Sequence, residues 1–323
     1  MGRGFVVGDV VVVLNFHGRA DTEACVASLV TGAPAATVLV VDNGSHDGTV
    51  DSVRRQWPHV ATIQNEVNLG FAGGMNTGLR WALDHGAETI TVLNNDTLVP
   101  VGVMDRLIAT ARTGAAVSPE SGGAYYADGS ERVWFGGGTI DGATGLARHQ
   151  SDAELAKLAL RDGLRATTTL AGCCVTASAD TWRRVGLFDE RYFLNFEDSD
   201  WSLRAAAAGV PLVVDPTIHI HHRVSASFVG AYSYLGLYYY ARNGLLFVRG
   251  RQRGTARQAA IFLRRHVVPG LGHHARTRDW TELARRSVIV SAALASYASS
   301  QFGRAPRWLE RRAAAWSRQG QPE

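Results

Sequence analysis

The stretch "TITVLNNDTLVP", residues 89–100, decides the fold class, because a run of apolar and β-branched residues stops abruptly at Asn94, Asn95 and Asp96. The apolar run predicts a strand buried on both faces, as in a parallel sheet covered by helices. A carboxylate at the end of such a strand is costly to desolvate unless it meets a cation. Ligands of open α/β sheets bind beyond the carboxyl ends of the strands, so we interpret residues 94–96 as part of a ligand site.

The chain before this stretch repeats the same alternation of strand and helix. Apolar runs precede helical patterns that open at Asp21, near Thr49 and at residues 73–86. Each run also ends in polar side chains, and these are Asn15, Asp42, Asn43 and Asn65. The pattern predicts an α/β fold with a mostly parallel sheet flanked by helices and a polar edge.

The later chain is organised differently. We expect a strand and hairpin near 134–145, an apolar strand at 168–177, a helix opening at Ser178, a loop at 186–198, a helix at 199–209, and one or two strands within 211–222. From about residue 230 the pattern is helical, with arginines beside apolar stripes. We therefore predict an α/β domain over residues 1–228 and a basic, mostly helical appendage over residues 229–323.

The charge of the chain is unevenly distributed. Residues 242–323 hold 16 arginines and four acids, whereas residues 1–241 hold 17 basic and 25 acidic side chains. An arginine-rich segment favours a polyanionic surface, either an anionic membrane or a nucleic acid. No apolar run is long enough to span a bilayer and no secretory signal opens the chain, so we expect a cytoplasmic protein, soluble or peripheral. The three cysteines lack metal-ligand spacing and are expected to be reduced core residues.

Two glycine-containing stretches follow predicted strands. In "VDNGSHDGT" (41–49), Asp42 could accept hydrogen bonds from a nucleobase or ribose, although an ordinary Asx-capped turn explains the pattern as well. In "NLGFAGGMNTG" (68–78), glycines would let an anion approach a helix N-terminus. This second stretch lacks the lysine of a Walker loop and the spacing of a Rossmann fingerprint.

Two later stretches offer titratable side chains. "FEDSDWSLR" (196–204) crowds Glu197, Asp198 and Asp200 at a helix start, which raises a carboxyl pKa and suits a general base. The alternative is a solvated first turn, and for Asp200 we expect an ion pair with Arg204.

In "HIHHRVSAS" (219–227), His219 and His221 share one face of an extended segment and His222 lies on the other. One of the imidazoles could complete the coordination of an ion at Asp96, or each could be structural. Asp96 itself could instead cap a helix that begins near Val101.

Taken in order, these stretches resemble the family 2 glycosyltransferases of the GT-A fold, and most closely the bacterial rhamnosyltransferase-like enzymes. The resemblance covers roughly residues 8–250. It implies an inverting hexosyl transfer from a nucleotide diphosphate sugar to an acceptor hydroxyl on a glycan, glycolipid or metabolite, in cell wall or polysaccharide biosynthesis. The donor implied is dTDP-rhamnose, with UDP-sugars as the alternative.

The resemblance also implies roles for individual residues. Residues 1–100 would form the nucleotide-sugar-binding half and residues 101–228 the acceptor and catalytic half. Asp198 would be the catalytic base with Glu197 beside it, and Asp96 and His222 would bind a divalent metal. Nucleotide-sugar contacts are implied for Asn15, Asp42, Asn43, Asn68, Gly70, Phe71, Gly74, Asn76, Asn94 and Asn95. Because Asn94 replaces the first carboxylate of the family's DXD motif, one acid remains, and an imidazole ligand would favour Mn²⁺ over Mg²⁺.

The basic helices fit a lipid-linked acceptor, because they could lie at the inner face of the cell membrane. Packing on the domain or formation of a homodimer would explain them equally well. A nucleotidylyltransferase would need basic residues after the first strand, where the chain has Arg19 only, and Lys157 is its single lysine. A non-catalytic nucleotide- or nucleic-acid-binding protein could use Trp280 and Trp308. That alternative leaves Glu197, Asp198 and residues 94–96 unexplained, so we do not expect nucleic acid as a partner.

Overall fold

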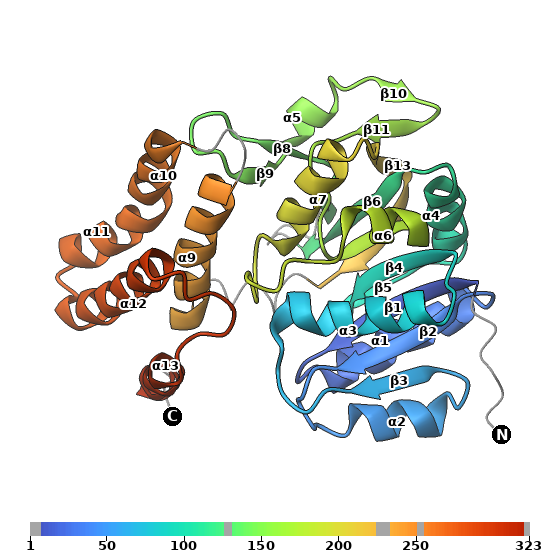
Figure 1. The fold of residues 1–323 in the computed structure, drawn as a ribbon, viewed down its shortest axis with the longest axis horizontal. Coiled ribbons are helices and arrows are strands. Elements are labelled where there is room, and N and C mark those ends of the chain that lie inside the picture. Colours follow the sequence, from blue (N-terminus) through green and yellow to red (C-terminus); the bar gives the residue numbers. More distant parts are fainter. Residues whose placement is uncertain (1–7, 126–130, 224–232, 251–254, 320–323) are drawn as a thin grey trace. The chain divides into compact units, whose positions relative to one another are not determined.

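The computed structural model describes residues 8–125, 131–223, 233–250 and 255–319, which form two compact units (Figure 1). The sheet unit comprises the described residues of Met1–Thr139, Arg148–Asp189 and Glu197–Val224. The helical unit comprises Ile140–Ala147, Glu190–Phe196 and the described residues of Ser225–Glu323. The predicted domain boundary at residue 228 lies outside the described residues, so that division stays a prediction.

The sheet unit contains one large mixed sheet whose order is β10-β11-β13-β6-β12-β4-β1-β2-β3, with β5 on β13 and β7 on β6. Its strands are β1 (Asp9–Asn15), β2 (Thr37–Asp42), β3 (Ala61–Gln64), β4 (Thr89–Asn94), β5 (Thr97–Leu98), β6 (Ala116–Tyr125), β7 (Glu131–Phe135), β10 (Leu160–Arg161), β11 (Leu164–Ala166), β12 (Cys174–Ser178) and β13 (Leu212–His222). Strands β8 (Gly138–Ile140) and β9 (Ala147–His149) form a separate two-stranded sheet. The run β4-β1-β2-β3 is wholly parallel, as the sequence predicted.

Helices cover both faces of this sheet. One face carries α1 (Arg19–Gly32), α2 (Thr49–Gln56) and α4 (Val103–Arg112), and the other carries α3 (Gly70–Asp84), α6 (Ala179–Val185) and α7 (Glu197–Ala207). The short helix α5 (Asp152–Leu155) completes the unit. Because side chains of a strand alternate between faces, Val11 and Val13 join the first core while Val10 and Val12 join the second. Burial of each such side chain contributes about 1.5–3 kcal/mol.

Several elements differ in extent from the sequence-based expectation. Helix α1 begins at Arg19 rather than Asp21, and α3 begins at Gly70, where the side chain of Asn68 accepts a hydrogen bond from the Gly70 N–H (2.8 Å). Residues 211–222 form one strand, β13, with an irregularity between Asp215 and His219. Ser178 caps α6 as predicted.

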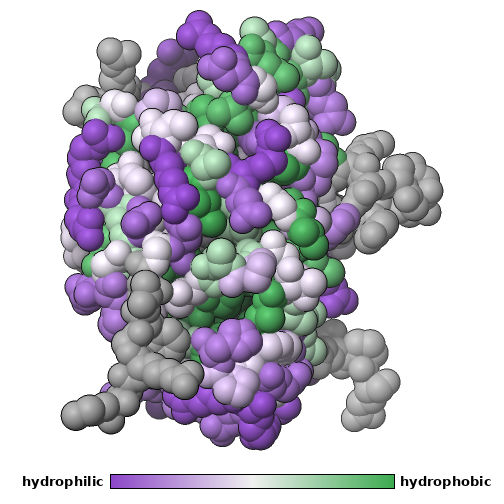
Figure 2. All heavy atoms as spheres, turned by 90° about the vertical axis from the view of Figure 1, so that its right-hand side faces the viewer, coloured by the Kyte–Doolittle hydropathy of each residue, from purple (hydrophilic) through white to green (hydrophobic). Residues whose placement is uncertain are grey.

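Two of these differences concern the polar edge of the sheet. Strand β12 begins at Cys174, not at residue 168, because the chain before it turns toward α7. Helix α7 begins at Glu197, two residues before its predicted start, which puts both neighbouring acids in its first turn. On the face of the molecule drawn in Figure 2, hydrophilic residues are interspersed with hydrophobic ones, as is usual for protein surfaces.

The helical unit is built from α9 (Tyr234–Gly250), α10 (Ala256–Phe262), the π-helix η1 (Leu263–Val267), α11 (Val268–Arg276), α12 (Trp280–Ala298) and α13 (Arg307–Gln319). Helix α12 packs on α9, and the hydroxyls of Tyr238 and Ser296 are hydrogen-bonded across that interface at 2.9 Å. Among the helices that the structure describes, none is both long and apolar enough to cross a bilayer. The three cysteines are buried and free, as expected.

Candidate active site

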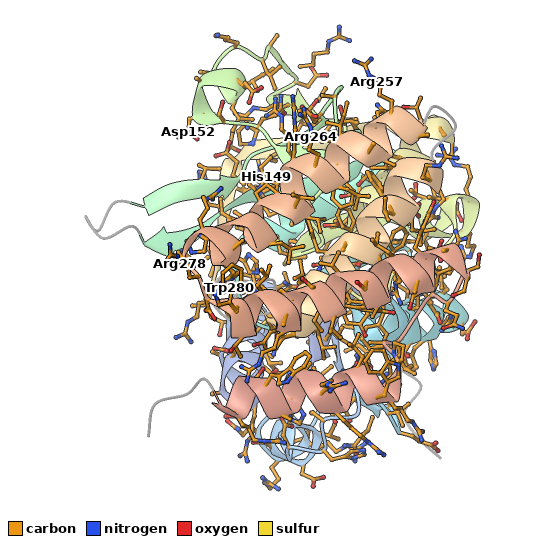
Figure 3. All side chains as sticks on the ribbon, turned by 90° about the vertical axis from the view of Figure 1, so that its left-hand side faces the viewer. His149, Asp152, Arg257, Arg264, Arg278 and Trp280 are labelled. Atoms are coloured by element: carbon orange, nitrogen blue, oxygen red, sulfur yellow. The ribbon has the colours of Figure 1, made fainter. Side chains whose placement is uncertain are left out.

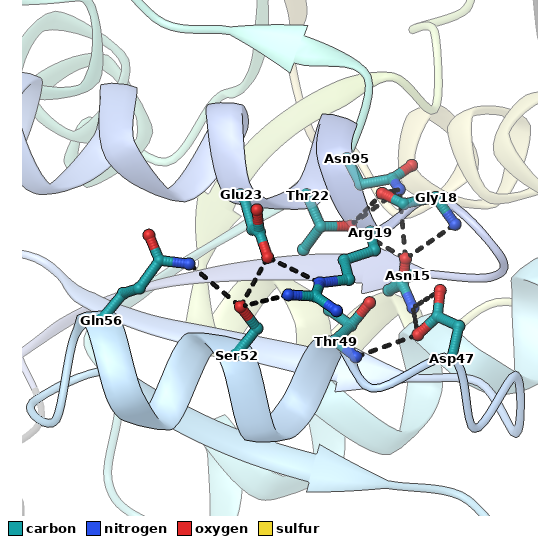
Figure 4. A network of polar contacts seen from close by, with 10 residues as sticks. All are labelled: Asn15, Gly18, Arg19, Thr22, Glu23, Asp47, Thr49, Ser52, Gln56 and Asn95. Atoms are coloured by element: carbon teal, nitrogen blue, oxygen red, sulfur yellow. Dashed lines mark hydrogen bonds and ion pairs between the residues drawn. The ribbon is translucent and has the colours of Figure 1, made fainter.

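The polar ends of β1, β2 and β4 meet at one edge of the sheet. The Asn15 amide donates to Oδ1 of Asp42 (2.8 Å), and its oxygen accepts from the hydroxyl of Thr22 (2.9 Å). The Asn95 amide donates to the same hydroxyl at 2.9 Å (Figure 4). Asn15 is completely buried, so this side chain links the strand ends to one another through protein contacts.

Asp42 is held by four hydrogen bonds. Its Oδ1 accepts from Asn15 and from the hydroxyl of Ser45, and its Oδ2 accepts from the His46 N–H (3.2 Å) and the Gln64 amide (3.0 Å). Burial opposes ionisation of this carboxyl, but the hydrogen bonds outweigh burial and lower its pKa. Asp42 therefore stays a fixed carboxylate at the end of β2.

Asn43 joins β2 to the start of α3. Its amide donates to the Gly70 carbonyl (2.9 Å) and to Oδ1 of Asn68 (3.1 Å). A Cβ on Gly74 would lie 2.7 Å from Leu14 Cδ1 and 2.8 Å from the Asn43 amide nitrogen, so only glycine lets this turn of α3 approach the strand ends. The glycine-rich stretch thus brings the first turn of α3 to the polar edge.

Asn76 has surroundings different from those of the other predicted nucleotide contacts. It is buried, its amide donates to the Phe188 carbonyl (2.9 Å), and its oxygen accepts from the Phe188 N–H (3.1 Å). The half-buried ring of Phe71 lies 6.2 Å from the Phe188 ring. Asn76 therefore anchors the loop that leads toward α7.

Asp96 and His222 form a buried pair. His222 Nε2 lies 3.2 Å from Asp96 Oδ1, and the two side chains are 6% exposed for Asp96 and 3% exposed for His222. The pairing of β5 with β13 explains this contact, because it sets Thr97 opposite His222. Asp96 does not cap a helix, since α4 begins at Val103 after Gly102.

Several polar atoms around this pair lack a partner. Neither oxygen of Asp96 accepts a hydrogen bond from any residue that the structure describes, and the same holds for His222 Nδ1 and Asn94 Oδ1. Asn94 Nδ2 lies 3.3 Å from His222 Nε2. His219 and His221 are exposed on the opposite side of β13. His222 is thus the histidine that reaches Asp96.

The pair fits a divalent cation that binds together with a substrate. A buried carboxylate without hydrogen bonds is stabilised by a cation, and an imidazole nitrogen is already beside it. In the described ranges no group of three or more His, Cys, Asp or Glu side chains could hold a metal. The protein would therefore supply two ligands, and phosphate oxygens and water the rest.

Asp198 lies in the first turn of α7, where backbone groups fix its carboxylate. Its Oδ2 accepts from the Gly172 N–H (2.9 Å), and its Oδ1 accepts from the Ser199 N–H (2.6 Å). A Cβ on Gly172 would lie 3.3 Å from the Asp198 side chain. Asp200 pairs with Arg204 at 2.8 Å, as the sequence predicted.

Glu197, next to Asp198, has a strongly shifted pKa. Burial of the carboxyl, and secondarily the negative charge of Asp198, raise its pKa to about 8. Its Oε2 has no hydrogen-bond partner among the described residues. The raised pKa keeps Glu197 protonated at neutral pH.

A short backbone segment connects the two parts of the site. The Asn94 N–H donates to the Cys173 carbonyl (2.9 Å), and the Gly172 N–H donates to Asp198. Burial raises the pKa of the Cys173 thiol to about 12, and the carboxylates of Asp96 and Asp198 both contribute. Two backbone hydrogen bonds at adjacent residues thus link the end of β4, which leads to Asp96, with the first turn of α7, which holds Asp198.

Comparison with known proteins shows the enzyme class of the chain. The sequence profile of glycosyl transferase family 2 matches residues 10–136, the part of the chain that holds Asn15, Asp42 and Asp96. The chain is a glycosyltransferase whose residues 10–136 match family 2.

The relatives of this glycosyltransferase include two rhamnosyl-transferring enzymes. The N-acetylglucosaminyl-diphospho-decaprenol L-rhamnosyltransferase of Mycobacterium tuberculosis is 26% identical over 265 residues, which is 75% of this chain and 85% of the relative. The dTDP-rhamnosyl transferase RfbF of Shigella flexneri is 25% identical over 228 residues, 66% of this chain and 70% of the relative.

A mannosyltransferase of Pyrobaculum calidifontis, solved with GDP-Man and Mn²⁺, superposes with a TM-score of 0.55 at 17% identity. The match covers 91% of this chain and 87% of that one. It shows a shared fold, and the predicted GT-A fold is confirmed.

The structure adds site neighbours that sequence reasoning missed. Nδ1 of His149 is hydrogen-bonded to the Trp134 carbonyl (2.8 Å), and the Trp134 ring lies 4.6 Å from the His149 ring and 4.9 Å from the His222 ring. Desolvation lowers the pKa of His149, while Asp198 acts in the opposite direction. Gly172 was missed as well. A lone aromatic, histidine or glycine outside a motif gives no sequence signal, whereas the three-dimensional contacts reveal all three.

Proposed function

We propose that this glycosyltransferase transfers rhamnose, with inversion, from dTDP-rhamnose to a hydroxyl of a lipid-linked acceptor. The observation that supports the proposal is a pair of backbone hydrogen bonds from adjacent residues: the Cys173 carbonyl accepts from the Asn94 N–H, two residues before Asp96, and the Gly172 N–H donates to Asp198. Such an arrangement separates a site for a charged leaving group from a base for an incoming hydroxyl. The choice of sugar rests on the names of the two rhamnosyl-transferring relatives.

Asp198 is the proposed general base. Its oxygens accept hydrogen bonds from the N–H groups of Gly172 and Ser199, which fix the carboxylate before a substrate arrives. Glu197, with its raised pKa, stays protonated beside it, so that one negative charge rather than two faces the acceptor. Asp198 would take the proton of the acceptor hydroxyl as that oxygen attacks the anomeric carbon.

Asp96 and His222 are the proposed ligands of Mn²⁺ or Mg²⁺. A bound ion would supply positive charge to offset the charge of the departing diphosphate. The chain itself contributes the first turn of α3, whose N-terminal end favours an anion and which Asn43 holds at the sheet edge. Asp42, fixed as a carboxylate, is the proposed acceptor of hydrogen bonds from the nucleoside.

Ligand-induced stabilisation followed by turnover tests this function. The purified chain would be heated with dTDP-rhamnose, dTDP-glucose, UDP-glucose or GDP-mannose, each with and without Mn²⁺. A ligand at 100 times its dissociation constant stabilises the folded state by about 2.7 kcal/mol. We expect the largest shift with dTDP-rhamnose and Mn²⁺, and an inverted anomeric carbon in the product. Selective stabilisation by another nucleotide sugar would identify that compound, rather than dTDP-rhamnose, as the donor. No response to any nucleotide sugar would refute the proposal.

We propose that the helical unit lies against an anionic membrane. A groove of about 540 Å³ on α12 and α13 is lined by Trp280, Arg285, Val288, Arg312 and Trp316, among others. Trp280, labelled in Figure 3 at the start of α12, is 63% exposed. Exposed tryptophan beside arginine suits the interface of a bilayer with anionic lipids. A peripheral position at the inner face of the membrane would suit a lipid-linked acceptor.

Flotation with vesicles tests the membrane proposal. The full chain should bind vesicles that contain phosphatidylglycerol, bind neutral vesicles weakly, and lose binding as salt rises. Trp280→Ala should weaken binding, whereas Val101→Ala, at an exposed apolar position of the sheet unit, serves as the control. Equal binding to neutral vesicles, or binding unaffected by Trp280→Ala, would contradict this role. Light scattering on the same samples would reveal a homodimer, the alternative use of these helices.

A further inference from the structure

Trp134 occupies an irregular position in strand β7. Along the pairing of β7 with β6, Phe135 lies opposite Ser121 and Val133 lies opposite Gly122. Trp134 stands between them without a partner in the ladder, so it is the extra residue of a β-bulge. In a regular strand Val133 and Phe135 would share one face, but here Phe135 is buried, Val133 is exposed and Trp134 is half-buried. Bulges redirect side chains in this way and are common beside active sites.

Polar contacts hold the backbone of this bulge in place. The Trp134 carbonyl accepts a hydrogen bond from Nδ1 of His149 at 2.8 Å. Two residues later, the Gly136 carbonyl accepts from Arg165 Nη1 at 2.8 Å, and the same nitrogen pairs with Glu120 at 2.7 Å. The ion pair is largely shielded from water, since its side chains are 11% and 10% exposed. The bulge is therefore fixed by protein contacts before any ligand binds.

The neighbours of the Trp134 ring belong to the candidate active site. The centroid of the ring lies 4.9 Å from that of His222, whose Nε2 is 3.2 Å from Asp96 Oδ1. It lies 4.6 Å from the ring of His149, on whose pKa the charge of Asp198 acts. All of these residues belong to the sheet unit. The bulge thus directs an aromatic ring to the histidine that reaches Asp96.

Trp134 and His149 keep polar atoms available for a ligand. The indole N–H of Trp134 donates to no residue that the structure describes. Nδ1 of His149 carries the hydrogen donated to the Trp134 carbonyl, so Nε2 of the neutral ring is an acceptor, and it too has no partner in the described ranges. The described rings around Trp134 are tilted or T-shaped to it, and none stacks on it in parallel.

We propose that Trp134 is a donor-binding residue that contacts the hexosyl group of the nucleotide sugar. The hexose is bonded directly to the diphosphate, so it lies next to a cation held by Asp96 and His222. Trp134 borders that place, because its ring contacts the His222 ring. The C–H groups of the hexose pack on the indole, and the indole N–H donates to a sugar hydroxyl. This inference rests on the proposed binding of a nucleotide sugar at Asp96 and His222.

The affinity of Trp134→Leu for two ligands tests the inference. Leucine keeps an apolar side chain in the bulge but removes the ring and its N–H. Calorimetry with saturating Mn²⁺ would give the dissociation constants of dTDP-rhamnose and of dTDP, which lacks the hexose. For dTDP-rhamnose we expect a rise of about tenfold, as for the loss of an aromatic anchor, whereas the value for dTDP should stay within about twofold.

Two further variants serve as controls. Trp134→Phe keeps a ring but loses the N–H, so its affinity for dTDP-rhamnose should lie between those of wild type and Trp134→Leu. Trp81→Leu removes the other tryptophan of the sheet unit that stacks on a histidine, at 4.2 Å from His85. Trp81 lies about three helical turns after Gly70 in α3, away from the strand ends, so both affinities should be unchanged.

The pair of ligands separates a contact with the hexose from an effect on the cation. Equal rises for dTDP and dTDP-rhamnose would mean that Trp134 acts through His222, and would overturn the inference. A higher KM for the acceptor with unchanged donor affinity would assign the ring to the acceptor, and would overturn it as well. An equal rise in Trp81→Leu would show a general loss of structure and count against it.

The outcomes also distinguish this inference from the proposed function. If the wild-type chain neither binds nor transfers any nucleotide sugar, the proposed function fails and the inference fails with it. If the wild type transfers sugar, an unchanged affinity in folded Trp134→Leu overturns the inference alone. Should Trp134→Leu not fold by circular dichroism, an unchanged affinity in Trp134→Phe overturns it. If another nucleotide sugar is the donor, the same comparison is made between that compound and its free nucleotide.

Discussion

Two groups of polar side chains at the same sheet edge differ in how well the protein satisfies them. Around Asn15 and Asp42, the amide and both carboxylate oxygens have protein partners. Around Asp96, Glu197 and His222, buried oxygens and a ring nitrogen have none among the described residues. A satisfied network stabilises the fold by itself, whereas an unsatisfied one destabilises it until a ligand arrives. The second group is therefore where we propose that a metal, the diphosphate and the acceptor bind.

The largest effect should come from Asp198, the proposed base, whose carboxylate backbone N–H groups fix. Asp198→Asn should lower kcat by about 100- to 10,000-fold, because an amide cannot take the proton of the acceptor hydroxyl. Donor affinity, measured by calorimetry, should be unchanged. Asp200→Asn, whose parent side chain pairs with Arg204, is the control and should keep most activity. Retention of turnover by Asp198→Asn would remove the proposed base.

Glu197 should make stability depend on pH. The folded form holds its proton up to about pH 8, whereas the unfolded chain loses it near the ordinary glutamate pKa of 4.5. The unfolding free energy should therefore fall as pH rises between these values, by about 1.4 kcal/mol per pH unit from this group. Urea unfolding of wild type and Glu197→Gln between pH 5 and 8 checks this. The two curves should diverge with pH, and parallel curves would contradict the raised pKa.

Asp42→Asn should destabilise the fold. The new side chain would have an NH₂ group in place of one carboxylate oxygen, and that group cannot accept the hydrogen bonds that Asp42 accepts from groups such as the His46 N–H and the Gln64 amide. We therefore expect the unfolding free energy to fall by about 1–3 kcal/mol. Asp51→Asn, at an exposed position on α2, is the matched control and should change little. Equal effects of the two substitutions in urea titrations would show that the network is not stabilising.

The same chemical change at Asp96 should have the opposite sign. Because no hydrogen bond from the described residues satisfies the buried carboxylate, Asp96→Asn should raise the unfolding free energy of the metal-free protein by about 1 kcal/mol. It should also abolish thermal stabilisation by Mn²⁺ and the nucleotide sugar. Destabilisation without metal would mean that Asp96 is a structural residue like Asp42.

The smallest effect is expected at the rim of the satisfied network. Arg19 pairs with Glu23 at 2.8 Å and contacts Ser52 in Figure 4, but its side chain is 47% exposed. Exposed pairs contribute little to stability, so Arg19→Ala should leave the midpoint of thermal unfolding nearly unchanged. Sugar transfer should persist as well. A large loss of activity would revive the nucleotidylyltransferase alternative, which needs a basic residue at this place.

The sequence predicted the parallel half of the sheet well, because a run of apolar residues such as 10–14 indicates by its composition alone a strand that is buried on both faces. It was less accurate around β12 and α7. Residues 168–173 have the composition of a strand, but β12 begins only at Cys174. The Gly172 N–H donates to the Asp198 carboxylate instead of to a neighbouring strand. The start of α7 at Glu197 depends on a left-handed residue at 196, which no periodicity reveals.

Within the site, sequence reasoning singled out residues in motifs but not their partners. Asn15 and Asn76 were expected to contact the nucleotide sugar, and the structure sets their amides against Asp42 and the Phe188 backbone. Those contacts join residues far apart in the chain, so no local pattern could have revealed them. That His222, rather than His219 or His221, reaches Asp96 depends on the register of β13 against β5.

The main-chain bridge at Gly172–Cys173 has a consequence for how such enzymes diversify. In the proposed site, the separation of the leaving group from the base depends there on backbone hydrogen bonds, which substitutions of side chains elsewhere in the site need not change. Under the proposed function, side chains around the sugar could then vary without moving these backbone atoms. Because the Trp134 ring lies 4.9 Å from the ring of His222, a proposed metal ligand, substitution of Trp134 would be a starting point for altering donor choice.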